Sequence, residues 1–413
     1  MSVAAQPEER VRGPLSVAEA RREMVAAVPP LGSELVPVGA ALMGRYLTRP
    51  VTARVTLPPF AASAMDGYAV RAADVTRVPL ALPVRGEMQA GSPPDSLELA
   101  PGTCAKVMTG APLPIGADAV VPYEWTDRGS ETVLIHERPR RGNAVRRAGE
   151  DLSPGKDVLP QGRRLRAVDL APLAASGQGE AEVGRQPQVA VVTTGDEIRP
   201  AGSTLGPGEI FDTAGPALEA LIVRAGGRVV RRATVGDDPL LVRRELEAAA
   251  EVADLLVTVG GVSMGDHDHV RATVQALGRL QFWRVAMRPG RPLAFGHFGR
   301  SAFLGLPGNP VSASVTFILF GMPLLAAMQG APEPDPGTVA VELLEDIEKP
   351  EGLETFHRAT LRARPGRLPG ARLAGNQSSG VTLSLARADC LLCLPAKGAA
   401  VARGSIVAAI PLP

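Results

Sequence analysis

Several residue types are scarce in this 413-residue sequence, and each shortage argues against a class of function. Aromatic side chains form only 3% of the chain, too few for a surface that stacks bases or sugars. The 44 basic and 43 acidic residues nearly balance, so no basic excess favours nucleic acid or an anionic membrane. Three cysteines are too few for a disulfide framework and indicate a reducing compartment, so we expect a cytoplasmic protein.

One long stretch without charged residues resembles a membrane segment in length. Residues 301–332 contain no Asp, Glu, Lys or Arg, and this number of residues could span a bilayer. The stretch is interrupted by Pro307, Gly308, Pro310 and Pro323, however. We therefore predict two buried strands, a tight loop and a buried helix, with no membrane segment. The polar N-terminus also lacks the apolar core of a signal peptide.

Changes in composition and pattern divide the chain into several predicted parts. A capping box at Ser16 and Glu19 starts a helix that should end before Pro29. The fold class that we predict is α/β plus β in several domains. After this helical segment (1–50), the predicted parts are a β-rich domain (51–150), a polar, glycine-rich segment (151–185), an α/β domain (186–330) and a small β barrel or sandwich (331–413).

The clearest pattern lies in the α/β region. Apolar runs at 188–194, 228–235 and 254–261 are typical of strands buried on both faces. Helices are expected between them, at about 214–225 and after the Asp238-Pro239 cap. This alternation predicts an open parallel sheet, and ligands bind such sheets outside the carboxyl ends of the strands.

The C-terminal region alternates apolar and polar residues with a period of two, which is typical of strands. Cys390 and Cys393 are expected on opposite faces of one extended run, since a zinc site would need further ligands. Strands are predicted in TVAVELLEDI (338–347), TFHRATLRAR (355–364), GVTLSLA (380–386) and SIVAAIP (405–411).

Each of the three predicted strand exits in the α/β region carries glycine followed by carboxylates. The exits read TTGDE with Glu197, VGDD with Asp237, and VGGVSMGDHDH with Asp268. Glycine lets the backbone approach a ligand closely, and carboxylates without a basic partner suit a hard divalent cation such as Mg²⁺. These acids could instead serve as helix caps and turn residues, as Asp238 does in the predicted cap.

Two further features suit anions. The RPGRP turn places Arg288 and Arg291 close together after Arg284, and no acidic residue lies between Asp268 and Glu333. An unpaired arginine pair on a rigid turn predicts an oxyanion site. In GLPGNPVSAS, the Asn309-Pro310 cap would present backbone N–H groups to a phosphate, although it could also be a purely structural turn.

Together these motifs resemble those of the MoeA family of molybdopterin molybdenumtransferases and the E domain of gephyrin. The resemblance covers nearly the whole chain, and the order of its motifs makes it specific. The matching segments are SAMDGYAV (63–70), VMTGAPLPIGADAVV (107–121), RRAGEDL (146–152), TTGDE (193–197), GDD (236–238), GGVSMGD (260–266), FWRVAMRPGRPLAFG (282–296) and GLPGNPVSAS (305–314).

The resemblance implies an elongated four-domain chain with a three-layer α/β domain similar to MogA and a C-terminal β-barrel. It also implies that residues 1–50 and 151–185 together form one helical and linker domain. It also implies a homodimer, in which Asp66 and Thr109 of one subunit complete the site of the other. The implied reaction is the Mg²⁺-dependent insertion of molybdate into adenylylated molybdopterin with release of AMP. A molybdopterin adenylyltransferase is a possible protein partner.

The resemblance also implies roles for individual residues. Mg²⁺ would be held by Glu197, Asp237 and Asp268, and Arg146 and Asp151 would form a pair. Arg284 would contact phosphate or pterin. Residues implied in substrate binding are Gly260, Gly261, Ser263, Arg284, Arg288, Arg291, Asn309, Arg358, Ser378 and Ser379. The family turn is usually KPGKP, and the residue matching Arg284 is usually lysine, so the arginines here form a bulkier site with more donors.

Two alternative functions remain open at this point. The α/β region also resembles molybdopterin adenylyltransferases, although the β-rich domain and the MDGYA motif argue against that activity. A non-catalytic scaffold, as in the receptor-anchoring role of gephyrin, is the other alternative. Retention of the acidic motif positions argues against a scaffold.

Overall fold

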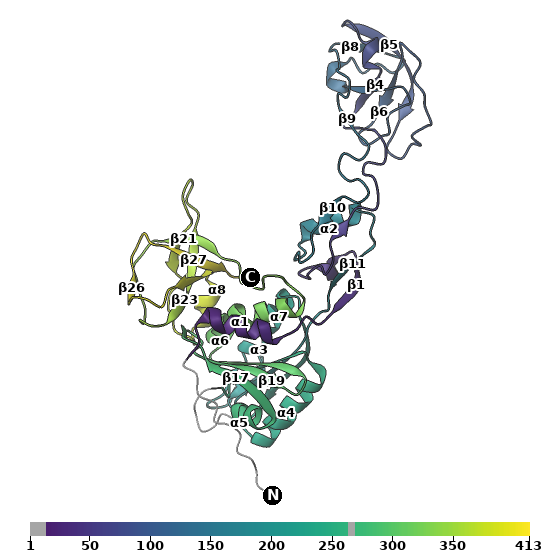
Figure 1. Ribbon diagram of the computed structural model, residues 1–413. Helices are drawn as coiled ribbons and strands as arrows, with labels where there is room; N and C mark the ends of the chain where they lie inside the picture. Colours follow the sequence, from purple (N-terminus) through teal and green to yellow (C-terminus); the bar gives the residue numbers. More distant parts are fainter. Residues whose placement is uncertain (1–13, 263–268) are drawn as a thin grey trace.

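The computed structural model of the chain describes residues 14–262 and 269–413. In Figure 1 the α/β body lies at the bottom, and the C-terminal barrel lies beside it. A long arm leads away from the α/β body and ends in a separate β-rich unit. Helix α1 (Val17–Ala27) begins with the predicted capping box of Ser16 and Glu19 and buries Val17, Ala20 and Met24.

The arm consists of two chain segments that are far apart in the sequence. Strand β1 (Ser33–Pro37) pairs antiparallel with β11 (Glu180–Gly184), and β2 (Val51–Thr52) pairs antiparallel with β10 (Asp157–Leu159). The short η1 helix (Ala40–Leu42) and α2 (Ala167–Ala175) complete the arm. The chain therefore leaves the α/β body along one segment and returns along the other.

The β-rich unit at the end of the arm is organised around a five-stranded sheet in the order β7-β4-β6-β5-β8. Tyr68, Val70 and Val121 lie in its core. Its elements are β3 (Ala62–Ser63), β4 (Gly67–Val70), η2 (Ala72–Asp74), β5 (Leu80–Met88), β6 (Cys104–Val107), β7 (Ala119–Pro122), η3 (Tyr123–Trp125), β8 (Thr132–Ile135) and β9 (Val145–Arg146).

The α/β body contains a six-stranded sheet in the order β15-β12-β16-β20-β19-β17. Its strands are β12 (Gln188–Thr194), β15 (Arg228–Val235), β16 (Leu255–Val259), β17 (Gly278–Arg284), β19 (Pro292–Phe298) and β20 (Ser301–Leu306). The first four strands in this order are parallel, as predicted, but β19 and β17 are antiparallel. Only two residues join β19 to β20, and such a short turn allows only an antiparallel pair. The uncharged stretch 301–332 contains one strand, β20, where two were predicted.

Helices cover both faces of this sheet. Val189 and Val191 of β12 face one apolar cluster, whereas Ala190 and Val192 face another. Leu218 packs in the first cluster and Leu246 in the second. The helices are α3 (Ala214–Arg224), α4 (Pro239–Val252) and α5 (His269–Leu277). Strands β13 (Ile198–Arg199) and β14 (Ile210–Phe211) form a separate two-stranded sheet, and β18 (Met287–Arg288) pairs with β23 of the C-terminal barrel.

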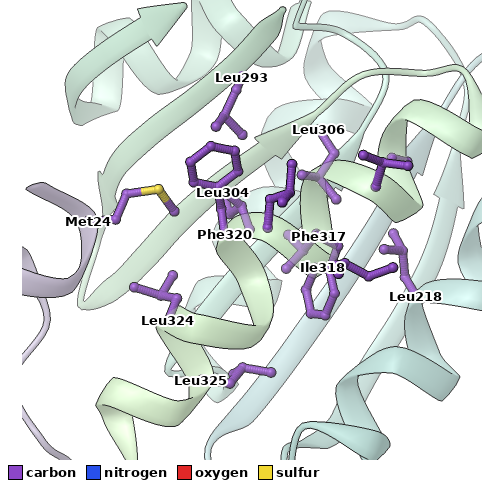
Figure 2. Packing of buried hydrophobic residues seen from close by; sticks show 14 of the residues in the cluster. Met24, Leu218, Leu293, Leu304, Leu306, Phe317, Ile318, Phe320, Leu324 and Leu325 are labelled. Atoms are coloured by element: carbon purple, nitrogen blue, oxygen red, sulfur yellow. The ribbon is translucent and has the colours of Figure 1, made fainter. Parts of the chain in front are cut away.

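The core of the α/β body is the apolar helix at 310–328. It comprises α6 (Pro310–Thr316), the π-helical segment η4 (Phe317–Gly321) and α7 (Met322–Met328). Its length and composition would suit a membrane span, but 94% of its most apolar window is buried within the protein. Figure 2 shows Phe317 and Phe320 packed among Leu304, Leu306 and Met24. Burying each aromatic ring stabilises the fold by about 2 kcal/mol.

The C-terminal barrel closes through β23, β24, β21, β27 and β25, with β25 returning to β23. GVTLSLA was predicted as a strand but forms helix α8, which turns Ser384 inward. Cys390 and Cys393 lie on opposite faces of β25, as predicted. The elements are β21 (Val339–Leu343), β22 (Ile347–Glu348), β23 (Glu354–Arg362), β24 (Gly370–Leu373), α8 (Thr382–Ala386), β25 (Cys390–Leu394), β26 (Ala400–Val401) and β27 (Ile406–Pro411).

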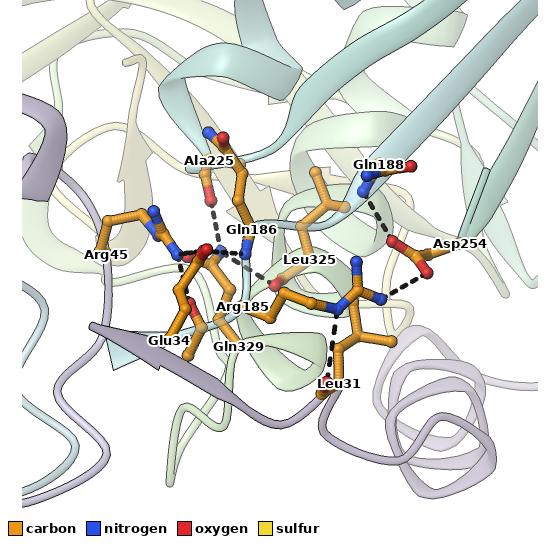
Figure 3. A network of polar contacts seen from close by, with 11 residues as sticks. Leu31, Glu34, Arg45, Arg185, Gln186, Gln188, Ala225, Asp254, Leu325 and Gln329 are labelled. Carbon is orange, nitrogen blue, oxygen red and sulfur yellow. Dashed lines mark hydrogen bonds and ion pairs between the residues drawn. The ribbon is translucent and has the colours of Figure 1, made fainter. Parts of the chain in front are cut away.

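A polar network joins the arm to the α/β body (Figure 3). The buried guanidinium of Arg45 donates hydrogen bonds to the Glu34 carboxylate and to the Gly184 carbonyl. Glu34 also accepts the Gln186 N–H at 3.0 Å. Arg185 pairs with Asp254 at 2.6 Å. Charged residues on both segments of the arm therefore fix its base to the α/β body.

Candidate active site

The acidic edge of the α/β body lies at the carboxyl ends of β15 and β12, which are neighbours in the sheet. Asp196 and Asp237 interlock there: the Asp237 N–H donates to Asp196 Oδ1 at 3.0 Å, and the Asp196 N–H donates to Asp237 Oδ2 at 3.4 Å. Glu197 is exposed beside them. The sequence pattern indicated Glu197 and Asp237 but missed Asp196, although it lies in the same TTGDE motif.

Two glycines leave the space that these acids occupy. A Cβ atom on Gly195 would lie 2.6 Å from Glu197 Oε2, and one on Gly236 would lie 2.5 Å from Asp196 Oδ1. The carboxylates of Glu197 and Asp196 therefore lie against the backbone of Gly195 and Gly236, at the ends of two neighbouring strands. Any side chain at either glycine would displace a carboxylate from this edge.

The donor set at this edge fits a hard divalent cation. Within 14–262 and 269–413, no ion pair links Asp196, Glu197 or Asp237 to a basic side chain. Oxygen ligands without a competing cation are what Mg²⁺ prefers. The same part of the chain contains no cluster of three or more His, Cys, Asp or Glu residues able to enclose a metal ion. The third predicted ligand, Asp268, and the predicted substrate residue Ser263 lie outside the described residues.

The third strand exit continues this edge toward the C-terminal barrel. Gly260 and Gly261 follow β16 directly, and the Gly260 N–H donates to the Leu306 carbonyl at 3.1 Å. A Cβ on Gly260 would come within 2.9 Å of the Thr194 hydroxyl, so the turn packs tightly against the β12 exit. A Cβ on Gly308 would lie 3.6 Å from Gly260. The glycine turn and the GLPGNP loop are therefore in contact.

A cleft of about 770 Å³ lies between the α/β body and the C-terminal barrel, and we call it the oxyanion cleft. It brings together Arg288 and Arg291 with Arg358, although these residues are distant in sequence. Parallel pairing of β18 with β23 holds the arginine turn against the C-terminal barrel. Polar residues that line the cleft are Arg288, Arg291, Ser312, Glu348, His357, Arg358, Asn376, Gln377, Ser378 and Ser379.

Arg358 is the most deeply buried cation in the oxyanion cleft, with 1% of its surface exposed. Its guanidinium donates to the carbonyls of Asn376 and Ser378, at 3.2 and 3.1 Å, and to the Ser384 hydroxyl at 3.2 Å. These partners are neutral, and burial lowers the pKa of Arg358. The positive charge is therefore positioned by dipoles without being neutralised, which suits an anion in the cleft.

Asn309 connects the helix at 310–328 to the oxyanion cleft. Its side-chain amide donates to the Ser379 hydroxyl at 3.1 Å, and the Val311 N–H donates to the Ser379 carbonyl at 3.3 Å. One of the N–H groups predicted to bind phosphate is thus taken by the protein. Ser379 lines the oxyanion cleft and contacts the GLPGNP loop through Asn309. The same loop contacts the glycine turn at Gly260.

Asp66 and Thr109 form a pair, but they lie at the end of the arm. Both the backbone N–H and the hydroxyl of Thr109 donate to Asp66 Oδ1, each at 2.7 Å. These bonds hold the pKa of Asp66 below its usual value. Asp66 directly precedes β4, which Figure 1 shows far from the α/β body. The pair therefore cannot join the acidic edge of its own subunit in this arrangement.

The structure thus groups the predicted residues into an acidic edge, an oxyanion cleft and a distant pair. Arg284, on β17, does not line the oxyanion cleft. Arg146 pairs with Glu150 at 3.8 Å, and this contact replaces the predicted pair with Asp151. Sequence patterns missed Ser312 and His357 in the cleft, since neither belongs to a charged motif.

Three family models match successive parts of the chain. The MoeA N-terminal region (domain I and II) matches residues 15–177, and a probable molybdopterin binding domain matches residues 190–327. The MoeA C-terminal region (domain IV) matches residues 340–412. All three parts of the structure are therefore represented.

Full-length relatives agree with these matches. Molybdopterin molybdenumtransferase 2 of Mycobacterium tuberculosis is 37% identical over 393 residues, covering 93% of this chain and 95% of its own. Molybdopterin molybdenumtransferase of Haemophilus influenzae is 33% identical over 400 residues, covering 96% and 98%. The solved molybdopterin biosynthesis moeA protein of Pyrococcus horikoshii OT3 has 27% identity and a TM-score of 0.79, covering 97% and 100%. The chain therefore belongs to the MoeA family of molybdopterin molybdenumtransferases.

Proposed function

We propose that this chain inserts molybdenum from molybdate into adenylylated molybdopterin, with Mg²⁺-assisted release of AMP. The observation that carries the proposal is the position of the acidic edge and the oxyanion cleft along one edge of the sheet. Contacts run from the β12 exit through Gly260 and Gly308 to Asn309 and Ser379. A ligand lying along this edge would meet carboxylates at one end and arginines at the other.

The acidic edge and the oxyanion cleft suit different parts of the reaction. Two carboxylates of the acidic edge, Glu197 and Asp237, would hold Mg²⁺ together with oxygens of the diphosphate, and the ion would offset the charge of the leaving AMP. Arg288, Arg291 and Arg358 would bind molybdate in the oxyanion cleft, because a guanidinium matches a tetrahedral oxyanion. The chemistry would then depend on positioning and electrostatics.

The proposal includes a homodimer in which the arm of one subunit reaches the acidic edge of the other. Asp66 and Thr109 form a hydrogen-bonded pair at the end of the arm, where the carboxylate could meet a partner subunit. A two-fold pairing would bring each arm to the partner subunit. A molybdopterin adenylyltransferase would supply the substrate, and the cytoplasm would be the site of action.

We also propose that the chain divides into domains as its composition and its resemblance to the family predict. The limits are 1–50 with 151–185, then 51–150, 186–330 and 331–413. The antiparallel pairing of β1 with β11 supports joining the two parts of the first domain. The separate sheets of the other three support the remaining boundaries.

The test supplies adenylylated molybdopterin, Mg²⁺ and molybdate and measures both AMP and active cofactor. Asp237→Asn should slow Mg²⁺-dependent AMP release by about 10²-fold, because a carboxylate of the ion site is lost. Arg288→Ala should raise the molybdate concentration needed for half-maximal insertion, and added salt should reduce the difference from wild type. The control is Arg243→Ala, which removes an exposed arginine paired with Glu247 on α4.

Two results would contradict the proposal. Wild-type AMP release by Asp237→Asn would remove the acidic edge from the reaction. An unchanged molybdate requirement in Arg288→Ala would remove the oxyanion cleft. Formation of adenylylated product from ATP and molybdopterin would favour the adenylyltransferase alternative instead.

A further inference from the structure

His357 is an unexplained residue in the oxyanion cleft. It lies on β23 next to Arg358, and it lines the cleft between the α/β body and the C-terminal barrel. Its Nδ1 atom is buried and has no hydrogen-bond partner among the residues that the structure describes. A buried ring nitrogen without a partner is rare in proteins, because the lost hydration is not replaced. Within a cleft that fits an anion, such an atom indicates a missing ligand.

The surroundings of His357 keep its ring neutral in the free protein. Burial lowers its pKa to about 4, and the positive charges of Arg358, Arg288 and Lys349 act in the same direction. The other charged residues that line the cleft are Arg291 and Glu348, and Glu348 is exposed at its rim. A tetrahedral dianion bound among these cations would oppose their effect and raise the pKa of the ring toward its usual range.

The proposed reaction needs a group of this kind because it moves protons. When molybdate reacts with the dithiol form of molybdopterin, two S–H bonds and one Mo–O bond break. Two Mo–S bonds form, and both protons leave with the released oxygen as water. Molybdenum keeps its oxidation state, so no electron donor or acceptor is needed. Arg288, Arg291 and Arg358 cannot carry these protons, since guanidinium groups stay protonated in proteins.

We propose that His357 carries protons from the sulfur atoms of molybdopterin to the departing oxygen of molybdate. The ring enters the step neutral, accepts a thiol proton on one nitrogen, and donates it to the oxygen that leaves as water. It lines the same cleft as Arg288 and Arg291, where the oxyanion would bind. This role rests on the proposed function and adds a general acid–base group to a cleft that otherwise acts by fixed charge.

The test compares wild type with His357→Gln, which keeps a polar side chain but cannot carry a proton near neutral pH. We expect the variant to bind molybdate within about twofold of wild type but to insert molybdenum about 10²-fold more slowly. Wild-type insertion should slow as pH falls and the ring becomes protonated before the step. The variant should lack this dependence. His297→Gln, a half-buried histidine of β19 outside the cleft, is the matched control.

A further measurement separates proton transfer from a structural role. Added imidazole should restore insertion to His357→Ala, because it can occupy the vacated space and carry protons.

Wild-type insertion rates and pH dependence in His357→Gln would overturn the role of His357 and leave the proposed function intact. Slow insertion in His357→Ala that imidazole does not restore would also overturn it. Failure of the wild-type protein to bind molybdate or form cofactor would instead overturn the proposed function.

Discussion

At the scale of single residues, the oxyanion cleft depends on the missing side chain of Gly290. This residue is buried between Arg288 and Arg291 and has a φ of +98°, which side chains other than glycine rarely allow. A Cβ atom there would lie 2.2 Å from the hydroxyl oxygen of Thr316, which is buried on α6. The turn therefore rests directly on the core helix, and this contact fixes the spacing of the two arginines.

Gly290→Ala should weaken molybdate binding about tenfold and lower the free energy of unfolding by about 1–3 kcal/mol. The clash would move the turn away from the helix, and the positive φ would be strained as well. Adding Thr316→Ala should recover part of the binding, since it relieves the clash but not the strain. Calorimetry with molybdate and denaturant unfolding would measure both effects. Unchanged binding in Gly290→Ala would show that the turn does not position the anion.

At the scale of elements, sequence patterns predicted most of the helices and strands whose formation depends on nearby residues. The capping box at Ser16, the buried strand at 188–194 and the proline-capped helix after Asp238 all form as expected. The strand predicted in GVTLSLA was wrong. Its alternating pattern suits a strand, but the segment forms a helix that brings Ser384 to the buried Arg358. That contact spans the C-terminal barrel and leaves no signal in the local sequence. For the same reason, the acidic edge was predictable from its motifs, but His357 was not.

Helix α2 illustrates an element that one buried acid holds in place. The Asp169 carboxylate accepts hydrogen bonds from the side chains of Arg166 and Arg163 and from the Arg166 N–H. These groups, Arg166 first, hold the pKa of Asp169 well below its usual 3.8. A lowered pKa in the folded state contributes stability that is present above pH 3.8 and lost as pH falls through the folded value.

Asp169→Asn should therefore destabilise the arm by about 2 kcal/mol at neutral pH, because the charged hydrogen bonds are lost. As pH falls below about 4, the wild-type protein should lose this advantage and the two unfolding curves should converge. Urea unfolding of both proteins between neutral and acid pH would measure this. The control is Asp335→Asn, since Asp335 is 62% exposed and pairs with Arg21 on the α/β body. A constant difference at all pH values would contradict the linkage.

At the scale of the whole molecule, the arm separates groups that the proposed reaction brings together. The network of Arg45, Glu34, Arg185 and Asp254 fixes the base of the arm on the α/β body (Figure 3). Strand β4, which Asp66 directly precedes, lies in the β-rich unit, remote from α4, which begins two residues after Asp237 (Figure 1). Motifs predicted both residues, but no pattern in a single sequence places one subunit against another. The division of labour between subunits is therefore testable only by mixing them.

Subunits with different defects should restore one another's activity. In a dimer of Asp66→Asn with Asp237→Asn, one site would combine the intact Asp237 of the first subunit with the intact Asp66 of the second. The other site would lack both carboxylates. Mixed dimers isolated through two different tags should therefore show about half of the wild-type activity per dimer, whereas either variant alone should be nearly inactive.

The matched control pairs Asp66→Asn with the double variant Asp66→Asn/Asp237→Asn. No site in that dimer keeps both carboxylates, so activity should stay absent. Cofactor formation from adenylylated molybdopterin and molybdate is the measurement in every case. An inactive mixed dimer, together with about half of the wild-type activity in a dimer of wild type and the double variant, would mean that each subunit uses its own Asp66. The arm would then have to fold back onto its own α/β body, against the polar network at its base.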